Sequence, residues 1–107
     1  MKTTMLFICM ANQQRSPTFE NWIRTNRPQY DVKSCGVSLS ADVRINKELL
    51  EWADKIFVMD LEQEMYIYRN FNELLNKVIL VGCSDEYQRE GLDLHRLIEY
   101  WVKKIGI

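Results

Sequence analysis

The chain has 107 residues, 47% of them hydrophobic and 27% charged, with a formal net charge of −1. These values are typical of one globular domain covering residues 1–107, and the chain is too short for two. A charge near zero argues against nucleic acid or an anionic membrane surface as the main partner, because both need a basic patch.

The cysteine content and the apolar start of the chain bear on whether the protein is cytoplasmic, secreted or membrane-bound. There are three cysteines, an odd number with no closely paired spacing, so we expect reduced thiols and no disulfide framework. The apolar run at residues 5–11 is too short for a membrane helix and has no small-residue cleavage site. We therefore expect a cytoplasmic protein.

The first predicted elements are a strand at residues 3–8 and a helix at residues 17–26. The strand is apolar throughout its centre, as expected of a strand covered on both faces. The helix places Phe19, Trp22 and Ile23 on one face, and Arg27-Pro28 ends it.

The segment between that strand and that helix predicts an anion site. A tight loop before a helix points successive backbone N–H groups at a bound oxyanion, and the helix dipole adds positive charge. Arg15 can grip two phosphate oxygens, and the same donors stabilise Cys9 as a thiolate. We therefore expect phosphate, sulfate or vanadate-like oxyanions to bind at Met10, Ala11, Asn12, Gln13, Gln14, Arg15 and Ser16.

A second Cys-x5-Arg spacing occurs at Cys83 and Arg89, so the spacing alone is weak evidence. That copy contains Asp85 and Glu86, which would repel an anion. The first copy has no acidic residue between Cys9 and Arg15. Ser16 is there a candidate N-cap with proline at the first helical position. The context favours Cys9, as in a cysteine-based phosphatase.

The rest of the chain alternates strands and helices. We predict strands at residues 30–34, 56–59 and 77–81, helices at 45–53 and 61–70, and polar loops at 37–44 and 82–91. Asp60 is expected to cap the helix at 61–70 or to brace neighbouring loops. The last helix is clearly amphipathic, with an apolar stripe of Leu94, Leu97, Ile98, Trp101, Val102 and Ile105.

This order predicts an α/β fold, a single-domain three-layer sandwich with a central four-stranded parallel sheet flanked by helices. Ligands of such sheets bind beyond the carboxyl ends of the strands. The loop after Cys9, the loop at 37–44 and the loop that carries Asp85 all follow strands. We therefore expect the three loops to converge on one site.

The sequence resembles the low-molecular-weight protein tyrosine phosphatase family, and specifically its short bacterial and archaeal branch. The resemblance covers most of the chain and is most specific in the phosphate-binding loop. It rests on Leu6-Phe7-Ile8-Cys9, Asn12, Arg15-Ser16-Pro17-Thr18, Glu20, Ser34-Cys35-Gly36-Val37, the run Trp52 to Asp60, and Asp85-Glu86-Tyr87.

The resemblance implies a role for each matching residue. Cys9 would attack phosphorus to form a phosphocysteine, Arg15 would bind the phosphoryl oxygens, and Ser16 would donate a hydrogen bond to the Cys9 thiolate. Asn12 would hold the unusual backbone of the loop.

The same resemblance implies that Asp85 is the general acid and base, and that Tyr87 lines the substrate pocket. The substrate would be a phosphorylated protein or a small aryl phosphate. The chain departs from the longer enzymes at Ala11, where they have glycine, at Gln14, where they have a second cysteine, and at Glu86, where they have proline.

Other functions remain open at this point. A thiol-dependent arsenate reductase of the same fold needs two relay cysteines, and Cys35 and Cys83 do not stand in relay positions. A phosphocysteine carrier or a silent phosphotyrosine-binding module would not need both Arg15 and Asp85. We read Cys35 and Cys83 as structural and expect no cofactor. With one histidine, His95, we expect no histidine-rich metal site. We also expect a monomer.

Overall fold

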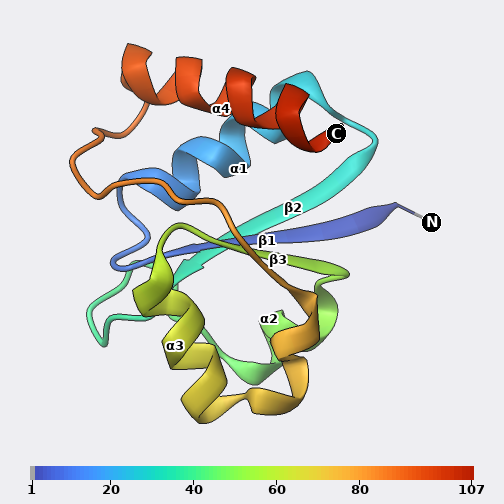
Figure 1. The fold of residues 1–107 in the computed structure, drawn as a ribbon, viewed down its shortest axis with the longest axis vertical. Helices are drawn as coiled ribbons and strands as arrows, with labels where there is room; N and C mark the ends of the chain where they lie inside the picture. The colour runs from blue at the N-terminus through green and yellow to red at the C-terminus, as the bar shows by residue number, and fades with distance from the viewer. Residues whose placement is uncertain (1) are drawn as a thin grey trace.

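Four parallel strands form the central sheet, in the order β2-β1-β3-β4, in a computed structural model that describes residues 2–107 (Figure 1). The strands are β1 (Thr3–Cys9), β2 (Tyr30–Gly36), β3 (Lys55–Val58) and β4 (Val78–Leu80). The helices are α1 (Arg15–Asn26), α2 (Lys47–Trp52), α3 (Leu61–Asn70) and α4 (Leu92–Ile105), with a 3₁₀ helix at Asn72–Lys77. The predicted α/β fold with a four-stranded parallel sheet is confirmed.

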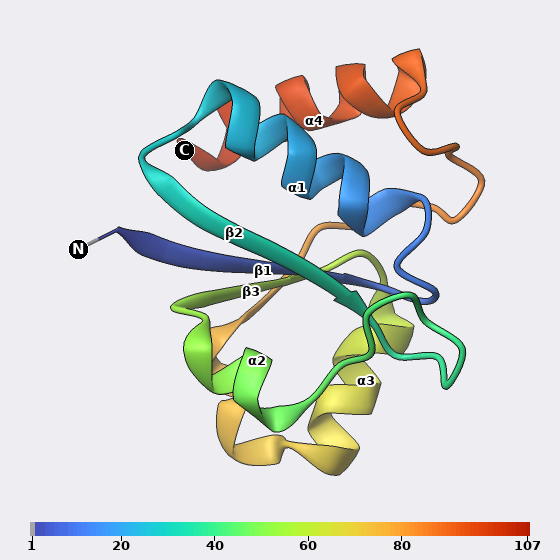
Figure 2. The same cartoon turned by 180° about the vertical axis from the view of Figure 1, so that it is seen from behind.

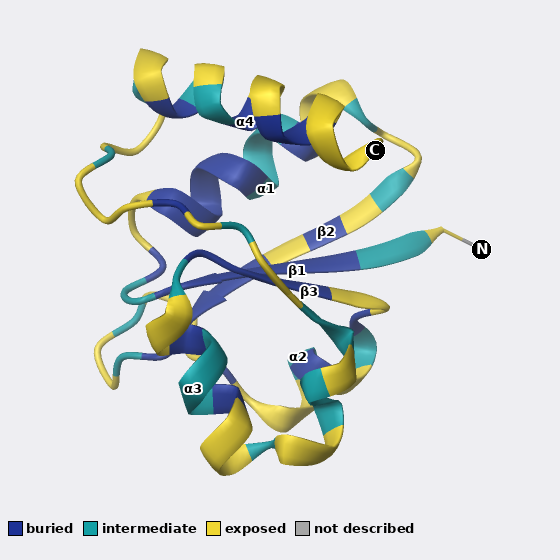
Figure 3. Cartoon of the chain, viewed as in Figure 1, coloured by how far each residue is buried: buried dark blue, intermediate teal, exposed yellow. Residues whose placement is uncertain are grey.

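The helices cover both faces of the sheet, so the fold has three layers. Helices α1 and α4 lie on one face, and α2 and α3 lie on the other (Figures 1 and 2). Successive residues of a strand point to opposite faces, so Phe7 packs with Phe19, Phe57 and Trp101 on the α1/α4 side. Leu6 belongs to the core on the α2/α3 side. This explains why β1 is apolar at consecutive positions and why its centre is buried (Figure 3).

The strands β1 and β2 both run further than predicted. Cys9 pairs with Gly36 as the last step of their parallel register. The backbone N–H of Ile45 then donates to the carbonyl of Gly36 at 2.8 Å, so the following loop is tied to the end of β2. Helix α2 consequently starts at Lys47 rather than residue 45, with Asn46 as the N-cap that accepts from Leu49 N–H at 2.8 Å.

Helix α1 begins at Arg15, two residues before the predicted start, and Ser16 is not its N-cap. The N-cap position is Gln14, whose side chain makes no capping bond. Ser16 is buried, and its hydroxyl lies 3.0 Å from the sulfur of Cys9 instead. The helical conformation therefore begins within the loop, at Arg15, and the Ser16 hydroxyl contacts the Cys9 thiol instead of capping the helix.

Strand β4 is shorter than the predicted strand at residues 77–81, because the 3₁₀ helix occupies Asn72–Lys77. Lys77 turns back and donates from Nζ to the carbonyls of Leu50 and Ala53, at 3.1 and 2.8 Å. A cation at these carbonyls satisfies groups that the end of a helix leaves unpaired. As an edge strand, β4 leaves Ile79 and Leu80 40% and 47% exposed.

Helix α3 has the bounds that the sequence predicts, and Asp60 caps it. The Asp60 carboxylate accepts from Glu62 N–H at 3.1 Å. The side chain of Gln63 accepts from the N–H of Asp60 at 2.8 Å, which completes a capping box.

Candidate active site

The loop at residues 9–16, here called the phosphate loop, surrounds the sulfur of Cys9 with donors. Cys9 ends β1 and is 2% exposed. Its sulfur lies 3.0 Å from the Ser16 hydroxyl and accepts from the backbone N–H of Asn12 at 3.3 Å. Hydrogen bonds of this kind stabilise a thiolate more than a neutral thiol.

Asn12 holds the shape of the phosphate loop. Its φ of 56° lies in the left-handed region, which asparagine tolerates better than most residues. Its Nδ2 donates to the hydroxyls of Ser16 and Ser34, at 3.0 and 2.9 Å, and its Oδ1 accepts from Val43 N–H at 3.2 Å. The hydroxyl of Ser34 in turn donates to the carboxylate of Glu20. The loop is thus tied to β2 and to α1.

Arg15 is 4% exposed and is held in a fixed orientation. Its Nη1 donates to Asp60 Oδ2 at 2.8 Å and to the carbonyl of Cys83 at 2.9 Å. Within residues 2–107, both hydrogen bonds of this guanidinium come from Nη1. The Nε and Nη2 groups are therefore available to two oxygens of a bound phosphate, the bidentate geometry that arginine favours.

The loop after β2 packs directly on the phosphate loop. Ser38 N–H donates to the carbonyl of Met10 at 2.9 Å, and Asp42 N–H donates to that of Ala11 at 3.1 Å. Gly36 stands at the closest approach, since a Cβ there would lie 2.5 Å from the Met10 carbonyl oxygen. The sequence predicted that these two loops converge, and this part of the prediction is confirmed.

Asp85 lines the same small cavity as the cysteine. This cavity has a volume of about 160 Å³. It lies at the carboxyl ends of the strands, where such folds bind ligands. Its lining residues are Cys9, Met10, Ala11, Gln13, Gln14, Arg15 and Asp85. The loop at residues 82–91, here called the acid loop, brings Asp85 to it from the far end of the chain.

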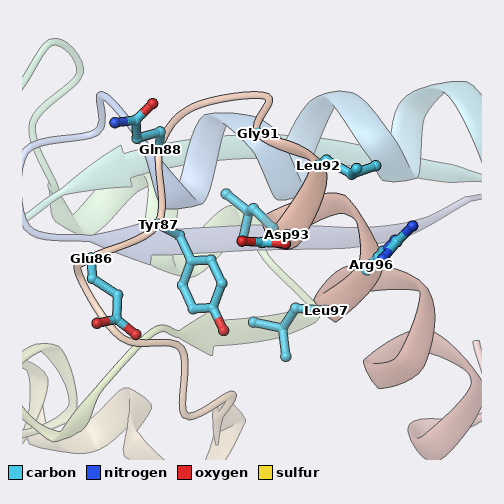
Figure 4. A pocket seen from close by; sticks show the side chains of 9 residues that line it. Glu86, Tyr87, Gln88, Gly91, Leu92, Asp93, Arg96 and Leu97 are labelled. Carbon is cyan, nitrogen blue, oxygen red and sulfur yellow. The ribbon is translucent and has the colours of Figure 1, made fainter.

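Tyr87 lies in a neighbouring groove, not among the residues that line the small cavity. This open groove of about 760 Å³ separates the acid loop from α4. Figure 4 shows the Tyr87 ring between Glu86 and Leu97, whereas Gln88 points the opposite way. The predicted pocket-lining role of Tyr87 stays a prediction.

Cys35 and Cys83 are buried free thiols. Burial, with a smaller contribution from Cys9, raises the pKa of Cys35 to about 12. Burial also raises the pKa of Cys83 to about 11, although Arg15 opposes the change. Both cysteines therefore stay protonated at neutral pH.

Two contacts of this site were not predicted from the sequence. The carboxylate of Asp60 reaches Arg15 across 45 positions of the chain, and the side chain of Gln14 reaches the acid loop across 75. The sequence predicted that Asp60 caps a helix or braces neighbouring loops, but it did not identify Arg15 as its partner. Nothing in the local sequence indicated the second.

Within residues 2–107, no helix combines the length and the apolar character needed to cross a membrane. That part of the chain also has no group of three or more His, Cys, Asp or Glu side chains arranged to hold a metal ion.

The chain is similar to known phosphatases along almost its whole length, although no protein-family model matches it. A low-molecular-weight protein-tyrosine-phosphatase of Acinetobacter johnsonii is 26% identical, covering 94% of this chain and 96% of the relative. The tyrosine phosphatase Wzb from Escherichia coli K30, solved in complex with phosphate, is 26% identical with a TM-score of 0.80. That match covers 98% of this chain and 96% of Wzb.

More distant structures share the fold. Vibrio vulnificus Wzb in complex with benzylphosphonate has a TM-score of 0.81 at 19% identity, covering 98% of this chain and 97% of the other. YwlE, an arginine phosphatase from Geobacillus stearothermophilus, has a TM-score of 0.75 at 20% identity, covering 97% and 93%.

The fold, the phosphate loop and these relatives define a cysteine-dependent phosphatase, a hydrolase of phosphoric monoesters. Along almost its whole length the chain is similar to low-molecular-weight protein-tyrosine-phosphatases.

Proposed function

We propose that the protein hydrolyses aryl phosphate monoesters, phosphotyrosine among them, through a phosphocysteine intermediate. The observation that carries this proposal is the single cavity that holds the Cys9 sulfur, the phosphate loop, Arg15 and Asp85. Nucleophile, oxyanion donors and acid are the three parts that such a displacement needs.

In the first step, the thiolate of Cys9 attacks phosphorus and the bond from phosphorus to the aryl oxygen breaks. Asp85, protonated at this stage, gives its proton to the departing phenolate. Arg15 and the backbone N–H groups of the phosphate loop stabilise the charge on the three phosphoryl oxygens in the transition state.

In the second step, water attacks phosphorus and the bond from sulfur to phosphorus breaks. The Asp85 carboxylate takes one proton from the water, and inorganic phosphate leaves. The Ser16 hydroxyl, 3.0 Å from the Cys9 sulfur, stabilises the thiolate as it departs. Cys9 and Asp85 then return to their starting states.

The burial of the other two cysteines favours hydrolysis over arsenate reduction. A relay of disulfides needs thiols that ionise and reach a reductant. Cys35 and Cys83 are buried, and burial raises the pKa of Cys35 to about 12 and that of Cys83 to about 11. The presence of Asp85 at the cavity argues against a carrier, whose phosphocysteine must persist.

The test compares p-nitrophenyl phosphate hydrolysis in EDTA by the wild type, Cys9→Ser and Asp85→Asn. We expect no turnover with Cys9→Ser and a loss of about 10²–10⁴-fold in kcat/KM with Asp85→Asn, the usual contribution of a general acid. Phosphotyrosine and phosphoarginine peptides, assayed side by side, identify the preferred leaving group.

Each outcome has one meaning. A wild type no faster than Cys9→Ser contradicts the enzymatic proposal. An Asp85→Asn rate equal to wild type contradicts only the role of Asp85. Phosphate that stays on Cys9 in the wild type after acid quenching, without release, supports the carrier instead, and thioredoxin-dependent reduction of arsenate supports the reductase.

A further inference from the structure

One face of helix α1 binds the acid loop through three polar side chains. Gln14, Thr18 and Asn21 are spaced four and three residues apart, so they lie on the same side of the helix. All three contact the acid loop at residues 89–90. In Figure 1 this loop, drawn in orange, passes beside the start of α1. We call this set of hydrogen bonds the α1 clasp.

The clasp joins the phosphate loop to the acid loop directly. Oε1 of Gln14, next to Arg15 in the phosphate loop, accepts from the backbone N–H of Arg89 at 2.5 Å. Thr18 Oγ1 accepts from the N–H of Glu90 at 2.9 Å and donates to the carbonyl of Gln14 at 2.7 Å. One buried hydroxyl therefore connects the backbones of both loops.

Glu90 anchors the acid loop through hydrogen bonds to α1 and α4. Its φ of 57° is unusual for a glutamate, so the backbone there must be held by its surroundings. Asn21 Nδ2 donates to one carboxylate oxygen at 3.0 Å, and His95 Nε2 lies 2.9 Å from the other. Helices α1 and α4 thus hold this residue from two sides.

We propose that the α1 clasp sets the position of Asp85 over Cys9, which makes Thr18 and Asn21 positioning residues for the acid step. The proposal rests on the proposed role of Asp85 as the proton donor. Arg89, whose N–H the clasp binds, lies only four positions after Asp85 in the chain. Because the clasp begins in the phosphate loop, it fixes the position of Asp85 relative to the backbone that we expect to bind phosphate.

The test uses leaving groups that need the acid to different degrees. Phenolate is a poor leaving group and depends on protonation, whereas 2,4-dinitrophenolate leaves with little help. Thr18→Val keeps the shape of the side chain and removes the hydroxyl. We expect it to lower kcat/KM about tenfold for phenyl phosphate and less than about twofold for 2,4-dinitrophenyl phosphate.

Three further variants separate positioning from structural damage. Thr18→Ser retains the hydroxyl and is expected to retain kcat/KM within about twofold. Asn21→Ala removes an exposed contact to Glu90 and is expected to show the same selectivity for leaving groups as Thr18→Val, with a smaller loss. Gln88→Ala is the control within the acid loop, because that side chain points away from Tyr87 and Glu86 (Figure 4).

A double-mutant cycle with Asp85→Asn decides whether the clasp acts through the acid. If it does, Thr18→Val has no further effect on phenyl phosphate once Asp85 cannot donate a proton. Equal losses for both substrates, or a full tenfold loss in the Asp85→Asn background, overturn the proposal. If Asp85→Asn alone has no effect on phenyl phosphate, the proposed function of Asp85 fails instead, and the two failures are thereby distinguished.

Discussion

Replacing Gly36 by alanine tests whether the end of β2 fixes the phosphate loop. The added Cβ would lie 2.5 Å from the carbonyl oxygen of Met10 and 2.8 Å from the nitrogen of Asn12. Both neighbours are backbone atoms, so no flexible side chain can turn away. Non-bonded heavy atoms prefer separations of about 3.5 Å or more, and the phosphate loop must therefore retreat by about 1 Å.

The expected cost follows from that displacement. Overpacking of a well-packed site costs about 1–3 kcal/mol of unfolding free energy. Misplacing reacting groups by about 1 Å can lower the rate by about 10²-fold. We therefore expect Gly36→Ala to lower kcat/KM for aryl phosphates by about 10²-fold and to weaken competitive inhibition by inorganic phosphate.

Gly106→Ala is the matched control for general destabilisation. Gly106 has a φ of +78° at the end of α4, and a Cβ there meets no atom within 4 Å. Alanine in this left-handed conformation costs about 1–2 kcal/mol, comparable to the expected cost at Gly36. Urea unfolding should show similar losses for the two variants, with activity lost only in Gly36→Ala. A Gly36→Ala enzyme with wild-type kcat/KM, or equal losses of activity in both variants, would show that Gly36 does not fix the phosphate loop.

Two further predictions concern ionisable groups. Iodoacetamide at neutral pH should add one carboxamidomethyl group, on Cys9, and inorganic phosphate should block it. Cys9 lines the small cavity, whereas Cys35 and Cys83 do not and have their pKa raised to about 12 and about 11. Mass spectrometry of the folded protein checks this, and a second adduct contradicts it. Partial burial alone would raise the pKa of Glu90, but hydrogen bonds from Asn21 and His95 lower it below 4.5. A carboxylate with a lowered pKa stabilises the fold above its unfolded pKa and loses that effect as pH falls through the folded pKa. The difference in unfolding free energy between the wild type and Glu90→Gln should therefore shrink as the pH is lowered below 4.5, and a constant difference would rule this out.

Several elements could be predicted because their signals are local. The apolar run of β1 requires cover on both faces, and the sheet supplies it. Helix α3 has the predicted bounds because Asp60 and Gln63 form a capping box within four residues. The parallel sheet followed from the alternation of strands and helices, and it brought the loop after β2 onto the phosphate loop.

Other features were wrong or missing in the prediction because they depend on distant residues. Ser16 matched an N-cap by local rules, but in the folded chain its hydroxyl lies 3.0 Å from the Cys9 sulfur and accepts a hydrogen bond from Asn12 Nδ2. Strand β4 was predicted too long because the role of Lys77 is to bind carbonyls at the end of α2, 24 to 27 positions earlier.

The order of residues along the chain was enough to place a cysteine and an arginine on a loop between a strand and a helix, at the end of β1. The orientation of the Arg15 side chain and the contact between the phosphate loop and the acid loop depend on the tertiary structure. Asp60 orients Arg15 from 45 positions away, and Gln14 meets the acid loop 75 positions away. Local propensities act over a few residues, whereas such pairings exist only after the sheet has brought its carboxyl ends together.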